Sequence, residues 1–155
     1  MANVSASRLT EQKIAPGVLA GVLEFDVLEG ALTAAATTEA LTIPGFPADA
    51  IPLHAEIAIG TFFTGGSATA VTAQIGDSGD PNGLLAALNV FDTTTLGDFT
   101  VGTLGVEAEY GSTGPSLESA YDPEILFTAT TDDVADLTAG KLTGRIYYKR
   151  YDGAK

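Results

Sequence analysis

The sequence contains no cysteine and no tryptophan, and it has a single histidine and a single methionine. The absence of cysteine excludes disulfides and cysteine-ligated zinc sites, and it fits assembly in a reducing cytosol. No run approaches the roughly 18 apolar residues of a membrane span, and the first ten residues lack the apolar core of a signal peptide. We therefore expect no membrane partner.

Basic residues are absent from the whole middle of the chain, since no lysine or arginine occurs from Ile14 to Gly140. This interval holds 18 of the 20 acidic residues, and the net charge of the chain is −13. Nucleic-acid binding is not expected, because phosphate contacts need cations. The acidic excess on its own would keep the protein soluble through self-repulsion. Alternatively, the basic ends dock on an acidic partner while the acidic middle faces solvent.

Segments with alternating apolar and polar residues recur along the chain, as is typical of strands with one buried face. They are residues 18–28, 37–43, 51–63, 71–75, 124–131 and 141–151. A chain of 155 residues, 45% of them hydrophobic, is expected to form one domain with a sizeable core. We predict an all-β fold, a β-sandwich or jelly roll of six to eight antiparallel strands over residues 17–155. An extended N-terminal arm, residues 1–16, precedes it.

The centre of the predicted fold is residues 51–80, which we interpret as a β-hairpin followed by an acidic turn. Gly65 and Gly66 separate its two strands, and glycine allows the positive φ angles of a hairpin turn. Residues 83–91 are predicted to form a short helical turn or an irregular apolar plug, and residues 99–106 a short strand. A long loop is predicted at residues 107–123, where Tyr110 and Tyr121 are candidates for surface contact.

The segment that ends at Gly83 has some features of a calcium-binding loop. With Gly83 as the sixth position, an EF-hand would need an acidic ligand where Ser78 stands and a glutamate where Asn89 stands, so it is excluded. Two interpretations remain. Asp77 and Asp80 form a lesser calcium site, or they belong to a plain turn in which aspartates accept hydrogen bonds from backbone N–H groups. The plain turn is favoured, and we expect no cofactor.

The candidates for catalytic residues do not combine into an active site. A serine-hydrolase triad would have to use His54, the only histidine, and the motif Gly-x-Ser-x-Gly is absent. The pairs Glu107/Glu109 and Asp132/Asp133 would suit a glycosidase only if they faced each other across a cleft, beside aromatic sugar platforms. We interpret these acids as solvated loop residues and His54 as a surface or interface residue. The protein is predicted not to be an enzyme.

The last predicted strand, residues 141–151, has two different faces. Leu142, Gly144, Ile146 and Tyr148 form an apolar inner face, whereas the outer face is basic and aromatic. Such a strand suits a sheet whose charged side faces either solvent or a partner. Together with the N-terminal cations, the candidate interface comprises Arg8, Lys13, Lys141, Arg145, Tyr147, Lys149 and Arg150.

Several segments, in this order, resemble a group of small structural proteins of tailed bacteriophages. They are IPGFPADAIP at residues 43–52, FFTGGS at 62–67, IGDSGDPNGL at 75–84, LFTAT at 126–130 and LTAGKLTGRIYY at 137–148. The resemblance covers roughly residues 30–150 and includes no catalytic signature. It implies a capsid decoration (cement) protein, a β-sandwich that binds the major capsid protein or other virion proteins. It also implies a homotrimer on the capsid surface, assembled in the host cytoplasm.

Two other functions remain open. The protein could be a different virion component, such as a head fibre or a part of the tail, neck or baseplate. It could also be a carbohydrate-binding β-sandwich module or adhesin, which would use Tyr110, Tyr121 and the acidic loops, with or without calcium. For a virion protein the basic ends are the natural docking residues, because complementary charge sets the register and rate of association.

Overall fold

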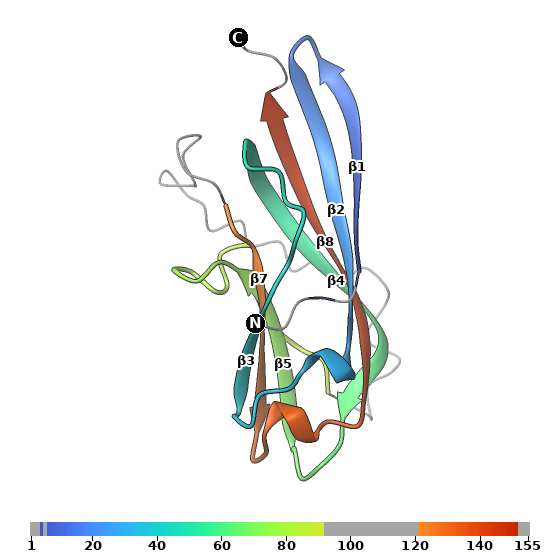
Figure 1. Ribbon diagram of the computed structural model, residues 1–155, viewed down its shortest axis with the longest axis vertical. Helices are drawn as coiled ribbons and strands as arrows, with labels where there is room; N and C mark the ends of the chain where they lie inside the picture. Colours follow the sequence, from blue (N-terminus) through green and yellow to red (C-terminus); the bar gives the residue numbers. More distant parts are fainter. Residues whose placement is uncertain (1–3, 5, 92–120, 152–155) are drawn as a thin grey trace.

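The computed structural model describes Val4, residues 6–91 and residues 121–151. These residues form eight β-strands and two single-turn 3-10 helices, η1 (Glu29–Ala31) and η2 (Val134–Asp136), and they include no α-helix. The strands make two four-stranded antiparallel sheets that pack face to face (Figure 1), which confirms the predicted all-β sandwich. No helix among the described residues has the length and apolar character needed to cross a membrane.

We call the two layers the long sheet and the short sheet. The long sheet has the order β1 (Ala6–Ala15), β2 (Val18–Leu28), β8 (Ala139–Tyr151), β4 (Ala50–Thr64). The short sheet has the order β3 (Thr38–Thr42), β7 (Glu124–Thr130), β5 (Ala70–Gly76), β6 (Leu85–Asn89). In Figure 1 the β1–β2 hairpin and the end of β8 project beyond the short sheet.

Alternate residues of both sheets fill the space between them, as their sequence periodicity predicts. Leu23 and Phe25 on β2 are buried, and so are Ile125 and Phe127 on β7. The ring of Phe127 lies 5.0 Å from that of Phe63 on β4, centroid to centroid. No polar or charged side chain is buried among the described residues. The core is therefore held by apolar burial, at about 25 cal/mol per Å² of apolar surface removed from water.

Two glycines of the long sheet make room for aromatic rings on the strand beside them. Gly144 on β8 is the register partner of Phe25 on β2, and a Cβ built on Gly144 would lie 2.2 Å from the Phe25 ring. Gly21 on β2 is likewise the register partner of Tyr148 on β8, and a Cβ at Gly21 would lie 2.2 Å from the tyrosine ring. Glycine is required at both positions because any side chain would displace a buried ring.

The N-terminal segment differs from the predicted free arm. Residues 6–15 form β1, which pairs with β2 from Ala6–Asp26 to Ala15–Val18, and Gly17 makes the turn between the strands with a φ of 71°. The segment is extended, as predicted, but it is an integral strand of the long sheet. No alternation is visible in the sequence because this strand carries polar or charged residues on both faces.

The hairpin predicted across residues 51–80 is wrong, although both of its strands form. β4 pairs with β8 in the long sheet, whereas β5 pairs with β7 and β6 in the short sheet. Gly65 and Gly66, with φ angles of 141° and 57°, carry the chain from one sheet to the other. An alternating pattern specifies a strand and its buried face, but it does not specify the neighbouring strand.

Residues 83–91 also differ from the prediction, since they contain the strand β6 and no helical turn. Their run of leucine and alanine is compatible with either structure, and pairing with β5 decides between them. The predicted strand at residues 99–106 lies outside the described residues. So does most of the predicted loop at residues 107–123, including Glu107, Glu109 and Tyr110.

Candidate functional site

The long sheet carries every lysine and arginine of the described residues. Two lie on β1 and four on β8, so the basic ends of the sequence come together with only β2 between them. These six cations outnumber the four carboxylates on the strands of the long sheet, which gives the strands a net charge of +2 in a chain of net charge −13. The carboxylates are Glu11, Glu24, Asp26 and Glu56. Charge is therefore segregated between the layers of the sandwich.

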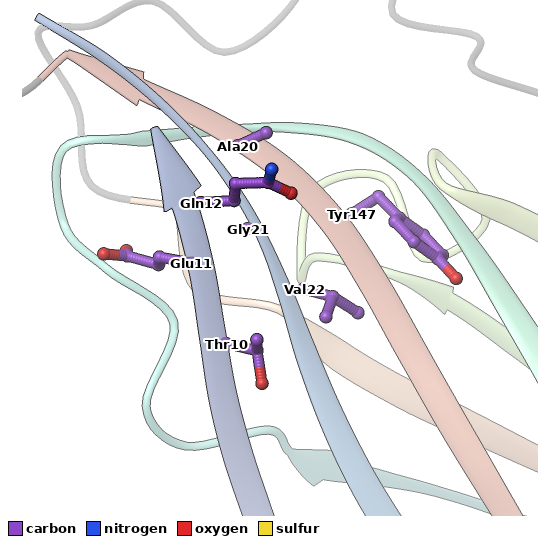
Figure 2. Close-up of a pocket in the computed structure, with 7 residues that line it drawn as sticks. All are labelled: Thr10, Glu11, Gln12, Ala20, Gly21, Val22 and Tyr147. Atoms are coloured by element: carbon purple, nitrogen blue, oxygen red, sulfur yellow. The ribbon is translucent and has the colours of Figure 1, made fainter. Parts of the chain in front are cut away.

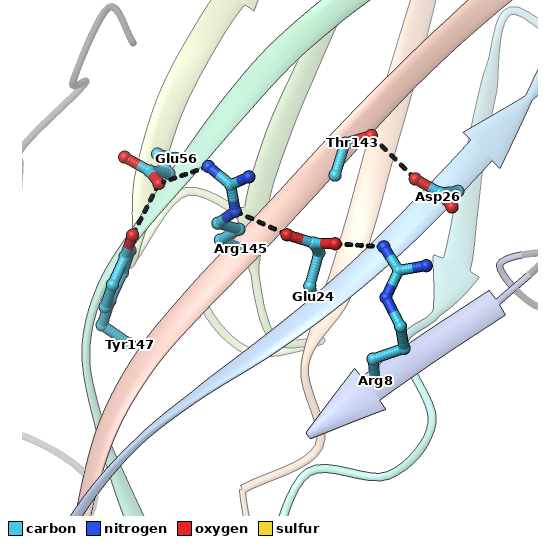
Figure 3. A network of polar contacts seen from close by, with 7 residues as sticks. All are labelled: Arg8, Glu24, Asp26, Glu56, Thr143, Arg145 and Tyr147. Atoms are coloured by element: carbon cyan, nitrogen blue, oxygen red, sulfur yellow. Dashed lines mark hydrogen bonds and ion pairs between the residues drawn. The ribbon is translucent and has the colours of Figure 1, made fainter. Parts of the chain in front are cut away.

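A row of alternating charges crosses the outer face of the long sheet (Figure 3). The strand register places Arg8 beside Glu24, Glu24 beside Arg145, and Arg145 beside Glu56. Arg145 donates from Nε to Glu24 at 2.7 Å and from Nη1 to Glu56 at 3.2 Å, and Arg8 donates to the other oxygen of Glu24. The hydroxyl of Tyr147 donates to Glu56 at 2.7 Å. One row thus ties all four strands together.

These contacts change the proton affinities of the groups involved. Hydrogen bonds from Arg145 and Arg8 hold the pKa of the Glu24 carboxyl below its ordinary value of 4.5. The same bonds raise the pKa of both arginines, and the hydrogen bond to Glu56 raises the pKa of Tyr147. Glu24 is therefore ionised throughout the neutral range and bound to its partners. Arg8 and Arg145 therefore hold neighbouring strands of the long sheet together.

A second group of ion pairs surrounds Arg150 at the projecting end of the long sheet. Arg150 donates to both oxygens of Glu11, at 2.6 and 2.8 Å, and to Asp49 at 3.3 Å. Tyr148 donates its hydroxyl to Glu11 at 2.7 Å, and Phe46 packs edge-on against the Tyr148 ring. Burial, followed by the bond to Glu11, raises the pKa of Tyr148. Arg150 thus anchors the connection between β3 and β4 onto the long sheet.

The lysines of the predicted interface have a different environment from the arginines. Lys13, Lys141 and Lys149 form no ion pair with any other described residue. Lys149 extends over Tyr151, with its Nζ 6.0 Å from the ring centroid. Lys13 and Lys149 lie at the projecting end, near the β1–β2 turn. Lys141 lies eight residues from Lys149 along β8, about 26 Å in an extended strand, so the structure does not bring it into the same surface.

A shallow depression lies on the outer face at the projecting end (Figure 2). Its volume is about 210 Å³, and small side chains on β2 leave the hollow between Gln12 on one side and Tyr147 on the other. It is open and mostly apolar, lined by Thr10, Glu11, Gln12, Ala20, Gly21, Val22 and Tyr147. Lys149 is the register partner of Ala20, so an unpaired cation borders the depression. We call the depression together with Lys149 the docking end; Lys13 lies at the same end of the sheet but, as the register partner of Leu19, on the opposite face.

Two other predicted candidates make contacts within the protein. Asp77 Oδ1 accepts hydrogen bonds from the backbone N–H groups of Gly79 and Asp80, at 2.7 and 2.8 Å, which is the plain-turn arrangement. No group of three potential metal ligands gathers anywhere in the described parts of the chain. His54 stacks on Tyr147, with ring centroids 4.5 Å apart and planes 14° apart. It is a surface residue at the flank of the docking end.

The remaining candidates have structural roles or lie elsewhere. Asp132 accepts hydrogen bonds from the N–H groups of Ser67 and Asp133, and the Ser67 bond lowers its pKa. Its charge raises the pKa of Asp136. Tyr121, predicted as a surface contact, is buried and packs edge-on against Phe46. That prediction is wrong because Tyr121 lies three residues before β7 begins and its ring belongs to the hydrophobic core.

Sequence reasoning missed the depression and the carboxylates that occupy the arginines. The partners of Arg8, Arg145 and Arg150 lie 16 to 139 residues away in the sequence, so they can be found only from strand register. The one available signal for the depression was the run of small residues on β2 opposite an aromatic strand. Comparisons with protein-family models, with curated proteins and with solved structures gave no match.

Proposed function

We propose that the protein is a structural component of a tailed-phage virion, a capsid decoration protein that binds an acidic surface of the head through its docking end. The observation that supports this proposal is the segregation of charge. In a chain of net charge −13, all described cations lie in one sheet, and the unpaired Lys149 borders an apolar depression at its projecting end. The phage setting comes from the sequence resemblance alone.

The docking end offers the two components that protein recognition uses. Lys149 attracts and orients an acidic partner, and the acidic remainder of the chain repels wrong orientations. The depression can accept one apolar side chain of the partner, shielded from water by Gln12 and Tyr147. The arginines are less suited to this role, because their guanidinium groups already bind Glu11, Glu24 and Glu56.

Decoration stabilises a capsid through linkage, because a protein that binds only the assembled shell favours that state. The test uses capsids of the phage that encodes this chain, assembled without it. Added protein should bind them in a salt-dependent manner and raise their melting temperature in calorimetry. Capsids that take up none of the protein, or that melt at the same temperature with it, contradict the proposal.

Location within the particle separates this function from the nearest alternative. Immuno-gold labelling should decorate the head uniformly, whereas a fibre, neck, tail or baseplate component would be labelled at one point. The carbohydrate-binding function loses one of its two proposed tyrosines, since Tyr121 is buried.

A further inference from the structure

The four edge strands of the sandwich are not equally protected against pairing with another chain. β3 and β6 have five residues each. β4 is longer, but it contains Pro52 and three irregularities in its register with β8. β1 has ten residues and stays in regular register with β2 from Ala6 to Lys13. Short length, proline, bulges and charged side chains are the usual means by which proteins protect sheet edges. β1 carries three charged residues, but it has none of the other three features along most of its length.

Apolar side chains are also exposed on β1. Ile14 is 58% exposed and Leu9 is 46% exposed, the two largest values among the exposed large hydrophobic residues of the described chain. Arg8 is directed along the sheet to Glu24, so it does not guard the edge. Among the described residues, β1 pairs with β2 only. The strand is thus long, regular and partly apolar, and no other described strand pairs with its outer edge.

We propose that β1 is the site at which two copies of this chain pair, antiparallel and edge to edge, about a two-fold axis at Gln12. Such an axis, perpendicular to the sheet, keeps side chains of one face opposite side chains of the same face. The Gln12 register places Glu11 opposite the second copy's Lys13, and Thr10 opposite its Ile14. On each side of the axis the second copy's Lys13 joins Arg150 and Tyr148, which already contact Glu11, as a further neighbour of opposite charge. Both exposed isoleucines also gain a neighbour.

Charge favours the Gln12 register, and it favours a second copy of this chain as the partner of β1. An axis at Glu11 would place the two Glu11 carboxylates opposite each other, and an axis at Lys13 would oppose the two lysines. Axes at Leu9 or Thr10 bring no opposite charges together. The whole chain has a net charge of −13. Two copies therefore meet with least repulsion at an edge whose own charged residues, Arg8, Glu11 and Lys13, give a net charge of +1. The pairing would also set both docking ends on one side of an eight-stranded sheet.

The contact is restricted to one strand and adjoining side chains, which is less than the roughly 1,600 Å² of a standard interface. We therefore expect a reversible dimer whose population rises with concentration. Sedimentation equilibrium of the full chain should show the mass increasing from 15.8 kDa toward twice that value. Lys13→Glu opposes like charges twice per dimer and should weaken association about tenfold or more. It should leave the melting temperature of the diluted monomer unchanged.

The absence of native cysteine permits a direct test of the register. Residues opposite each other in antiparallel strands have Cα atoms about 4.5 to 5.5 Å apart, which suits a disulfide. Mild oxidation should therefore cross-link Gln12→Cys into a covalent dimer. Ala87→Cys, at an exposed position of the edge strand β6, is the matched control and should remain monomeric.

Four results would overturn the proposal. They are a single-chain mass at every concentration, a three-chain mass as the phage resemblance implies, equal cross-linking at both positions, and association unaffected by Lys13→Glu. A Gln12→Cys thiol that resists a soluble thiol reagent would also count against it, because another part of the same chain would then cover the edge.

Discussion

The Nε of Arg145 on β8 lies 2.7 Å from Oε2 of Glu24 on β2, and Arg145 also reaches Glu56 on β4. The most central cation of the sequence-predicted interface is therefore engaged within its own sheet (Figure 3). Arginines hold the strands of the long sheet together, whereas the lysines remain available to a partner. This division of roles yields separate predictions for stability and for binding.

Replacing Arg145 should affect stability and replacing Lys149 should not. We expect Arg145→Gln to lower the free energy of unfolding by about 1 kcal/mol, because Glu24 and Glu56 each lose a partner in a half-exposed network. Lys149→Gln should stay within about 0.5 kcal/mol of the wild type, as is usual for unpaired surface residues. Urea unfolding at pH 7 measures both. Equal losses in the two variants would contradict the division of roles.

The ion pairs of Glu24 also predict how a variant should depend on pH. The folded protein lowers the pKa of Glu24 below 4.5, so its stabilising contribution is complete above that value and is lost as the pH falls through the lowered pKa. We expect Glu24→Gln to be less stable than the wild type at pH 7, with the difference shrinking as the pH falls below about 4.5. Urea midpoints measured from pH 7 to pH 2.5 give this difference directly, because the other carboxylates are common to both proteins. A difference that does not change with pH would show that Glu24 does not act through its charge.

The pairing of Gly144 with Phe25 predicts a loss of stability on adding one methyl group. In Gly144→Ala the new Cβ would lie 2.2 Å from the ring of Phe25, which is 1% exposed and has no free space to move into. We expect a loss of about 1–3 kcal/mol, as for overpacked cores. Gly30→Ala is the matched control, since a Cβ there meets nothing within 4 Å. If thermal unfolding finds the two variants equally stable, the packing of Phe25 against Gly144 is not as described.

Much of the fold could be predicted from the sequence, but its connectivity could not. The alternation along β2, β7 and β8 identified strands and their buried faces, because each strand has one apolar side. β1 escaped recognition because polar or charged residues lie on both of its faces. The pairing of β4 with β8, about 90 residues apart in sequence, depends on packing that no local pattern encodes.

The candidate site was predictable only in outline. Composition alone located the cations at the two ends of the chain, and the structure brings those ends into one sheet. Which cations are free depends on cross-strand neighbours, so the arginines could not be told from the lysines beforehand. The depression beside Ala20 arises from the juxtaposition of β1, β2 and β8, and it has no linear motif.

The most direct test of the docking end compares two lysines of one strand in capsid binding. Lys149→Glu and Lys141→Glu change the net charge of the protein equally, but only Lys149 borders the depression. We predict that Lys149→Glu lowers the affinity for undecorated capsids about tenfold or more, while Lys141→Glu binds like the wild type. Equal binding by both variants, or a greater loss from Lys141→Glu, would contradict attachment through this end of the long sheet.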